Sequence, residues 1–402
     1  MINSDIYAVL RIFNDDLVTN LENTFGHNTA FSSSALAAPT MAAVAVSSSV
    51  KSVVPLTSGL LGLAEITIAN DSHLTGFASK IEEAYSVRVL QYCDSQGHWQ
   101  WLRSGHRITG GDTVLMLGPV HMLEHAREQN RSGSKFEHIT RATPLEHFTD
   151  ERNLVIVCGL GRVGYRMIYV LATRIRPRPE IVVICHNETR APFIEAVQAL
   201  GAKVVKGDAR LADVLRAAGV QKAYSLAAVT SDNLVNIQIA LTARRLAPAI
   251  DVVLRVFSDV LTSELEQIFG PNTVFSTSAL AAPTIAAAAV DPDIRYVVNM
   301  GGRLLSSVEL VLHRESELVG KTVHQVYEQD HVIVILLHRQ GQRQLLPPPT
   351  TPLQANDEVV IMVEIDKMAQ LRAMGQPSRV ATPQQLVATR TQRLDNQSAS
   401  NP

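Results

Sequence analysis

The stretch NLVIVCGLGRVGYRMI, residues 153–168, decides the fold of this chain. An apolar run of β-forming residues, Leu154 to Cys158, leads directly into Gly-Leu-Gly-Arg-Val-Gly, and a helix-compatible stretch follows. This order predicts a strand, a tight turn and a helix start, as in folds that hold the phosphates of a dinucleotide. We expect Gly159 to make the turn, Gly161 to let the backbone approach a phosphate, and Gly164 to allow close packing of helix on strand.

The residues after this turn alternate between β and α patterns. Further strands are predicted at 181–185, 203–206, 222–228 and 252–256, with a helix in each interval. Such alternation predicts an α/β fold with a Rossmann-like, doubly wound parallel sheet. A helix N-terminus at the turn favours an anion, and Arg162 would add a cation there, although an exposed first-turn residue is the alternative interpretation.

The composition of the chain narrows the classes of protein to which it can belong. The chain has 402 residues, 46% hydrophobic and 18% charged, which is typical of a soluble protein with more than one domain. Its net charge of −2 gives no indication of a nucleic-acid partner. The three cysteines and thirteen histidines show no metal-ligand or redox spacing, so we expect reduced thiols and no metal site. The sequence shows no secretory signal and no apolar run long enough to span a membrane.

An internal repeat covers residues 8–46 and 252–290, without a gap and with most positions identical. Each copy reads as a strand, an amphipathic helix, a short strand and an Ala-rich helix with a serine near its start. The second copy ends the α/β unit, whereas nothing precedes the first copy. We therefore expect the first copy to be the end of a truncated α/β domain, without a nucleotide site of its own.

The Ala-rich helices contain Pro39 and Pro283, which should kink or restart them, since proline lacks the N–H for an interior bond. Their small side chains favour an interface role over plain core packing. Two β-rich segments also match each other, residues 63–128 and 296–374. In the first of them, ITIANDSHLTGF, VRVLQYC and DTVLMLG read as strands.

These motifs together resemble a known family. LVIVCGLGRVGYR, the Gly-Asp-Ala of VVKGDA, AAVTSDNLVNIQIALTARRL and VVLRVF are similar to the nucleotide-binding RCK (regulator of K⁺ conductance) or TrkA-N domain. The β-rich segments resemble the small α+β TrkA-C domain that follows it in Trk-type potassium transport regulators. The expected parts are a remnant of a first RCK domain (1–50), a first TrkA-C-like domain (55–130), a linker (131–151), an RCK/TrkA-N domain (152–290), a second TrkA-C-like domain (294–375) and a disordered tail (376–402).

The resemblance implies a set of nucleotide-binding positions. The Gly-rich turn would hold the phosphates, Asp208 and Ala209 would lie near the adenine or ribose, and three further residues would line the cleft. Asp208 could instead cap the helix that follows it. The implied positions are Gly159, Leu160, Gly161, Arg162, Val163, Gly164, His186, Asn187, Asp208, Ala209, Thr230, Ser231 and Arg255.

One position departs from the family pattern. Such folds tend to place an acidic residue at the end of the second strand to bind ribose hydroxyls, and this chain has His186, Asn187 and Glu188 there. A neutral or cationic contact would tolerate a 2′-phosphate better than an aspartate would. NAD(H), ATP, ADP and NADP therefore all remain candidates.

The resemblance implies a cytoplasmic gating protein of a potassium channel or transporter. It would lie at the inner face of the membrane through a membrane subunit, form a homo-oligomer through the Ala-rich helices, and bind nucleotide without catalysis. Two alternatives stay open, an NAD(P)-dependent oxidoreductase and a regulator of a cation/proton antiporter. Against the oxidoreductase, the sequence shows no Tyr-x-x-x-Lys and no His/Asp pair in a second domain.

Overall fold

The computed structural model describes residues 8–12, 16–25, 29–56, 59–94, 96–131, 153–186, 188–189, 191–291, 294 and 296–368. The chain divides after Leu304 into two compact units. The expected linker, apart from Arg131, and the expected disordered tail lie outside the described residues.

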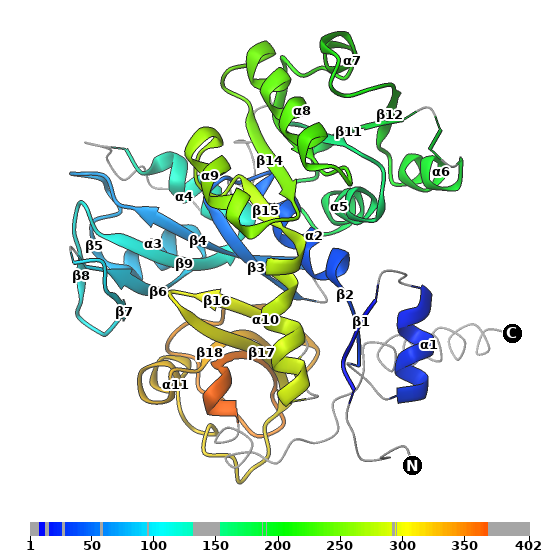
Figure 1. Cartoon of the computed structure of the whole chain (residues 1–402). Coiled ribbons are helices and arrows are strands. Elements are labelled where there is room, and N and C mark those ends of the chain that lie inside the picture. Colours follow the sequence, from blue (N-terminus) through cyan, green and yellow to red (C-terminus); the bar gives the residue numbers. More distant parts are fainter. Residues whose placement is uncertain are drawn as a thin grey trace, which may run out of the picture. The chain divides into compact units, whose positions relative to one another are not determined.

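A six-stranded parallel sheet forms the centre of the first unit, in the order β12-β11-β10-β13-β14-β15. Figure 1 labels β11, β12, β14 and β15 of this sheet. The sequence analysis predicted this doubly wound arrangement, with boundaries that differ by about one residue. The strands are β10 (Leu154–Cys158), β11 (Glu180–Cys185), β12 (Lys203–Lys206), β13 (Ala223–Ala228), β14 (Asp251–Val256) and β15 (Val274–Ser276).

Both faces of this sheet are buried because helices pack on each of them, and successive side chains of a strand point to opposite faces. Val155 and Val157 of β10 join a core that includes residues of α5, α6 and α2, whereas Ile156 and Cys158 join the core beneath α7, α8 and α9. The helices are α2 (Ser33–Val44), α5 (Arg162–Thr173), α6 (Ala191–Ala199), α7 (Ala212–Ala217), α8 (Asn233–Leu246) and α9 (Asp259–Phe269).

The internal repeat is also a structural repeat. In the first copy β1 (Leu10–Ile12) and β2 (Ala30–Ser32) pair in parallel, with α1 (Asp16–Phe25) between them in sequence. Arg11 is opposite Phe31 in this pair, and Arg255 is opposite Phe275 in the corresponding pair of β14 with β15. Each copy ends in an Ala-rich helix, α2 in the first and α10 (Thr277–Val290) in the second.

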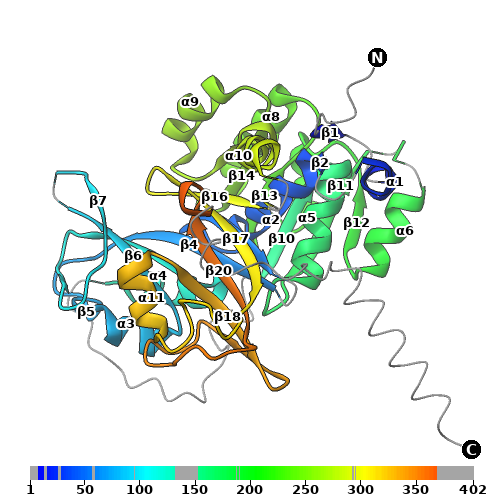
Figure 2. The same cartoon turned by 90° about the horizontal axis from the view of Figure 1, so that it is seen from below.

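The prolines do not restart these helices. Both α2 and α10 continue through their proline as single helices, which corrects the expectation of a restart. Neighbouring elements hold α2 in place, since it packs against α5 (Figure 2) and nearly all its residues are buried. Tertiary packing of this kind outweighs the loss of one backbone hydrogen bond.

The β-rich segment after α2 forms an antiparallel sheet in the order β3-β4-β9-β6-β7, with a separate β5-β8 pair. The strand expected over 66–77 is interrupted: β4 ends at Thr67, and a turn with Asp71 at φ 56° precedes β5. Strand β3 was not predicted because it contains Pro55, which an edge strand tolerates. The elements are β3 (Val50–Leu56), β4 (Gly59–Thr67), β5 (Gly76–Phe77), α3 (Ala78–Tyr85), β6 (Arg88–Cys93), β7 (Trp99–Trp101), β8 (Arg107–Ile108), β9 (Thr113–Pro119) and α4 (Val120–Gln129).

The second unit repeats this small domain. After β16 (Val297–Met300), its strands follow the order β17-β20-β18-β19, matching β4-β9-β6-β7. Corresponding pairs also carry the same bulge, between Val89 and Gln91 in one copy and between Val334 and Leu336 in the other. The elements are β17 (Arg303–Val311), α11 (Val323–Asp330), β18 (Ile333–Arg339), β19 (Gln342–Leu345), β20 (Glu358–Glu364) and a 3₁₀ turn (Ile365–Lys367).

Candidate nucleotide-binding site

A cavity of about 610 Å³ lies at the carboxyl ends of the parallel strands. Strand β10 is the first strand of the sheet and has β11 on one side and β13 on the other, so the cavity lies at the topological switch point where such sheets bind ligands. Its volume lies in the range of small-molecule pockets. Most of the predicted positions line it: Gly159, Leu160, Gly161, Arg162, Val163, His186, Asp208, Ala209, Thr230, Ser231 and Arg255.

The three glycines of the turn have different surroundings. Gly159 has φ +108°, and an added Cβ would lie 3.1 Å from Thr230 N. A Cβ on Gly164 would lie 1.9 Å from Gly159 O, so this glycine is required where helix α5 packs on the turn. A Cβ on Gly161 would meet nothing within 4 Å, which leaves its backbone open to the cavity. Gly164 itself does not line the cavity.

The N-terminus of helix α5 lies at the wall of the cavity. Gly161 is the N-cap residue, and no described side chain caps the helix. The first N–H groups of α5 are therefore available to an anion, with the helix dipole adding partial positive charge. Arg162, the first helical residue, is exposed beside them and lines the cavity.

Asp208 forms an ion pair and does not act as a helix cap. Its carboxylate oxygens accept from Arg210 Nε, both at 3.0 Å, and from Arg210 Nη2 at 2.6 Å. Helix α7 begins instead from Leu211 as its N-cap residue. The side-chain hydrogen bond from Arg210, followed by that residue's backbone N–H and charge, holds the pKa of Asp208 below its ordinary value.

A buried asparagine joins the ends of β13 and β14. Asn236 Oδ1 accepts from Thr230 N at 2.9 Å and from Thr230 Oγ1 at 2.7 Å, and Asn236 Nδ2 donates to Arg255 O at 2.9 Å. The sequence analysis quoted Asn236 within a motif but did not place it at the site. Its signal was the spacing Asp-Asn-x-x-Asn at a helix start after a strand.

Arg255 on β14 contacts the segment that follows the neighbouring strand β13. Its Nη1 donates to Thr230 O at 3.2 Å, and its guanidinium carbon lies 4.4 Å from the centre of the Phe257 ring. Burial lowers the pKa of Arg255, and its Nε has no hydrogen-bond partner among the described residues. The side chain is thus held in place while its buried Nε remains without a partner among the described residues.

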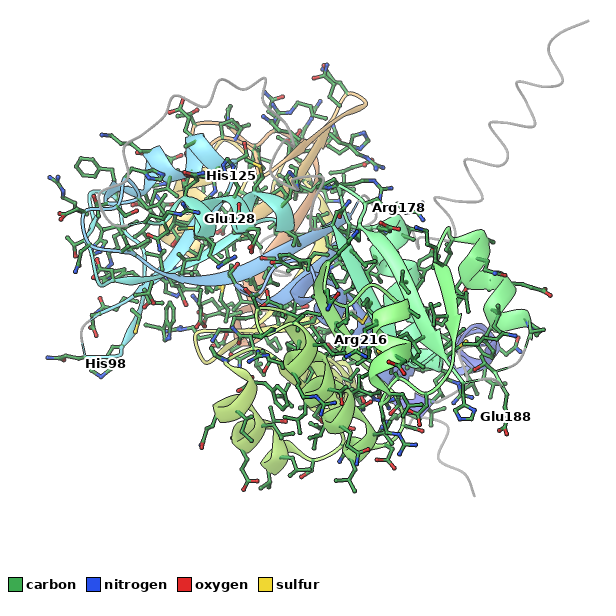
Figure 3. The ribbon with its side chains drawn as sticks, turned by 90° about the horizontal axis from the view of Figure 1, so that it is seen from above. His98, His125, Glu128, Arg178, Glu188 and Arg216 are labelled. Carbon is green, nitrogen blue, oxygen red and sulfur yellow. The ribbon has the colours of Figure 1, made fainter. Side chains whose placement is uncertain are left out.

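His186 is exposed at the end of β11 and lines the cavity. Asn187 lies outside the described residues. Glu188 is exposed and does not line the cavity. Figure 3 shows Glu188 and Arg178 at opposite ends of the sheet, Glu188 beyond the carboxyl end of β11 and Arg178 before its start.

The sequence analysis missed several lining residues. Arg210 and Asp232 come from the same domain, and Thr277 from the start of α10. The first repeat copy, which was expected to have no nucleotide site of its own, also contributes to the wall of this cavity. Its lining residues are Arg11, Ile12, Ser33 and Ser34.

The charge of the described lining favours an anion, because it contains four arginines and two aspartates. Within the described ranges, no group of histidine, cysteine and acidic side chains could hold a metal ion. No helix in the described part of the chain is long and apolar enough to cross a membrane.

Two parts of the chain match models of known protein families. Residues 155–277 match the family model of the TrkA-N domain, and residues 308–374 match that of the TrkA-C domain. A Trk system potassium uptake protein TrkA homolog of Archaeoglobus fulgidus is 26% identical over 226 residues, which are 56% of this chain and 50% of that protein. The TrkA protein of Streptomyces coelicolor is 27% identical over 225 residues, 54% of this chain and 94% of that protein.

The chain thus spans about half the length of the archaeal relative. A solved structure, the GsuK RCK domain, aligns with 91% of this chain and 74% of its own at 16% identity, with a TM-score of 0.46. Most of the residues that line the cavity lie within the first family match, and most of the repeated small domain lies within the second. The chain therefore carries a TrkA-N domain at residues 155–277 and a TrkA-C domain at residues 308–374.

Proposed function

We propose that this chain is a nucleotide-binding regulatory protein that gates a potassium channel or transporter and performs no catalysis. One observation carries the proposal: the TrkA-N match at 155–277 contains the Gly-rich turn and nearly all of the cavity at the carboxyl ends of the strands. The curated relatives are named as potassium uptake proteins, which supports the choice of transported ion.

The proposed ligand is a nucleotide whose phosphates lie on the turn at residues 159–164. An open backbone at Gly161, an uncapped α5 N-terminus and Arg162 all favour phosphate oxygens. Asp208, Ala209 and His186 would contact the nucleoside, and Asn187 remains a proposed contact outside the described residues. With no carboxylate from the end of β11 in the cavity, NAD(H), ATP, ADP and NADP are all candidates.

Binding would act by shifting a conformational equilibrium. A nucleotide can favour one state only to the extent that it binds that state more tightly. The protein would lie in the cytoplasm and meet the inner face of the membrane through the transport subunit. Homo-oligomerisation would use the Ala-rich helix α10, because α2 is already buried whereas α10 exposes Ala282, Ala286 and Ala289.

Thermal unfolding of the whole chain with ATP, ADP, NAD, NADH, NADP and NADPH tests the proposal. A nucleotide at a hundred times its Kd should stabilise the domain by about 2.7 kcal/mol. Arg162→Ala should reduce this stabilisation, whereas Arg166→Ala, on the same helix but outside the cavity lining, should retain it. Absence of any nucleotide effect, or an equal effect in Arg162→Ala, would contradict the proposed site.

A further inference from the structure

Part of the cavity wall belongs to the first repeat copy. Arg11 and Ile12 reach it from β1, and Ser33 and Ser34 reach it from the start of α2. Arg11 is the repeat counterpart of Arg255, since both occupy the same register position opposite a phenylalanine. One cavity thus contains the corresponding arginine of both copies.

The N-termini of the two Ala-rich helices differ. In α10 the N-cap residue Ser276 accepts a hydrogen bond from Ala279 N at 3.2 Å, as a helix cap does. In α2 the equivalent Ser32 makes no cap bond to a described residue, and its hydroxyl is instead 2.9 Å from Ser34 Oγ. The first N–H groups of α2 therefore lack the side-chain acceptor that their counterparts in α10 have.

A second observation at the same helix end indicates a ligand. Ser33 is only 6% exposed, and its Oγ has no hydrogen-bond partner among the described residues. Leaving a buried hydroxyl unpaired costs about 1–3 kcal/mol, so such groups are usually paired. Ser33 lines the cavity, so a ligand in that cavity could supply the missing acceptor.

We infer that Arg11, Ser33 and the N-terminus of α2 form a second anion subsite, which binds a phosphate other than those on the Gly-rich turn. This inference rests on the proposed function, because both subsites would hold one nucleotide. The ligand must carry a phosphate that reaches Arg11 and Ser33 in the part of the wall formed by the first repeat copy. Either the terminal phosphate of a nucleoside triphosphate or the 2′-phosphate of NADP could supply it.

Arg11 also connects the subsite to the second Ala-rich helix. Its Nη2 donates to Ser278 Oγ at 3.5 Å, at the start of α10. A phosphate held by Arg11 would therefore contact a side chain that links both repeat copies. Nucleotide identity would in this way be read by residues outside the matched TrkA-N domain, which begins only at residue 155.

Two ligand pairs that differ by one phosphate test the inference, ADP with ATP and NAD with NADP. Calorimetry on the full chain should show that the wild type prefers the phosphate-richer member of one pair. Arg11→Ala should weaken binding of that member by about tenfold or more, and Ser33→Ala by about threefold or more, with the poorer member unchanged. Arg103→Ala removes an exposed arginine of the first small domain and should behave as wild type.

Which pair responds identifies the source of the phosphate. If the wild type discriminates within neither pair, or if Arg11→Ala and Ser33→Ala keep the discrimination, the inference is wrong. If the wild type binds no nucleotide, the proposed function fails separately, and inorganic tripolyphosphate then tests the subsite alone. Tripolyphosphate binding that is weakened in Arg11→Ala would support the subsite, and no binding to the wild type would overturn it.

The ligand-free proteins give an independent readout. Because Ser33 Oγ has no partner among the described residues, Ser33→Ala should leave the melting temperature unchanged or raise it. A melting temperature lowered by several degrees would show that the hydroxyl has a structural partner, and would contradict its assignment to a ligand.

Discussion

At the scale of single residues, different glycines of the Gly-rich turn serve folding and binding. Gly164 allows α5 to approach Gly159 O, whereas Gly161 has open space where a Cβ would lie. Gly161 also has φ −96°, which any residue can adopt. The two glycines therefore make opposite predictions for the same substitution.

Gly164→Ala should destabilise the protein by about 1–3 kcal/mol, because its methyl group overlaps a backbone oxygen. Gly161→Ala should leave the free energy of unfolding unchanged or slightly raised, while it weakens nucleotide binding by obstructing the backbone N–H groups. Denaturant unfolding and calorimetry measure the two effects. Equal stability in both variants would refute the distinction.

The turn residues could be predicted from sequence because each follows a strand in a fixed order. The sequence analysis did not place Arg210 and Asn236 at the site, because their roles depend on the hydrogen bonds that Arg210 donates to Asp208 and that Asn236 accepts from Thr230. Arg11 and Ser33 carried no local signal at all. They reach the cavity only because the first copy packs beside the sheet, and that contact is tertiary.

At the scale of elements, strand β14 begins with Asp251, whose surroundings disfavour the charged form of its carboxyl group. Burial, and then the negative charge of Glu124 on α4, raise the pKa of Asp251, while Arg127 and Arg244 oppose the shift. Tyr224 on β13 also interacts with Asp251, and the Tyr224 hydroxyl donates to Glu124 Oε1 at 3.3 Å. The folded state therefore binds the Asp251 proton more tightly than the unfolded state does.

Stability contributed by that proton is lost as pH rises through the raised pKa of Asp251. Asp251→Asn should therefore stabilise the protein, by a margin that grows as pH rises from the ordinary pKa of an aspartate through the raised pKa of Asp251. Thermal unfolding of both proteins across this range measures the difference. A margin that is constant with pH, or a variant less stable at pH 8, would contradict the assignment.

Helix α11 of the second unit has a complete capping box. Thr322 Oγ1 accepts from Gln325 N at 3.2 Å, and Gln325 Oε1 accepts from Thr322 N at 2.8 Å. Thr322→Ala should cost about 1 kcal/mol of stability, with faster amide exchange in α11. Thr322→Ser keeps the acceptor and should resemble the wild type, and equal loss in both variants would exclude capping as the cause.

Prediction at the element scale succeeded where periodicity was strong. The alternating strands and helices of the central domain were placed within about one residue. Strand β3 was not predicted because it contains Pro55, which is typical of turns and edge strands. The strand expected over 66–77 was too long, because the chain turns at Asp71. Helix α10 was expected to kink or restart at Pro283, and it does not restart, because it continues as one helix to Val290.

At the scale of the whole molecule, the two Ala-rich helices of the repeat, α2 and α10, differ in how far their alanines are exposed. Ala38 and Ala42 of α2 are fully buried, whereas their counterparts Ala282 and Ala286 of α10 are exposed. Ala286→Glu should therefore reduce the sedimentation coefficient if α10 forms the proposed oligomer contact. Gln198→Glu on the exposed side of α6 serves as the control. An unchanged oligomer in Ala286→Glu would exclude α10.

The central claim is that the TrkA-N domain binds a nucleotide at its Gly-rich turn. Calorimetric titration of the wild type and Gly161→Asp with the candidate nucleotides tests it most directly. The account predicts saturable one-to-one binding of at least one nucleotide to the wild type. It predicts loss of that binding in Gly161→Asp, in which a carboxylate faces the phosphates while the fold is retained. No binding to the wild type, or equal affinity in a correctly folded Gly161→Asp, would contradict it.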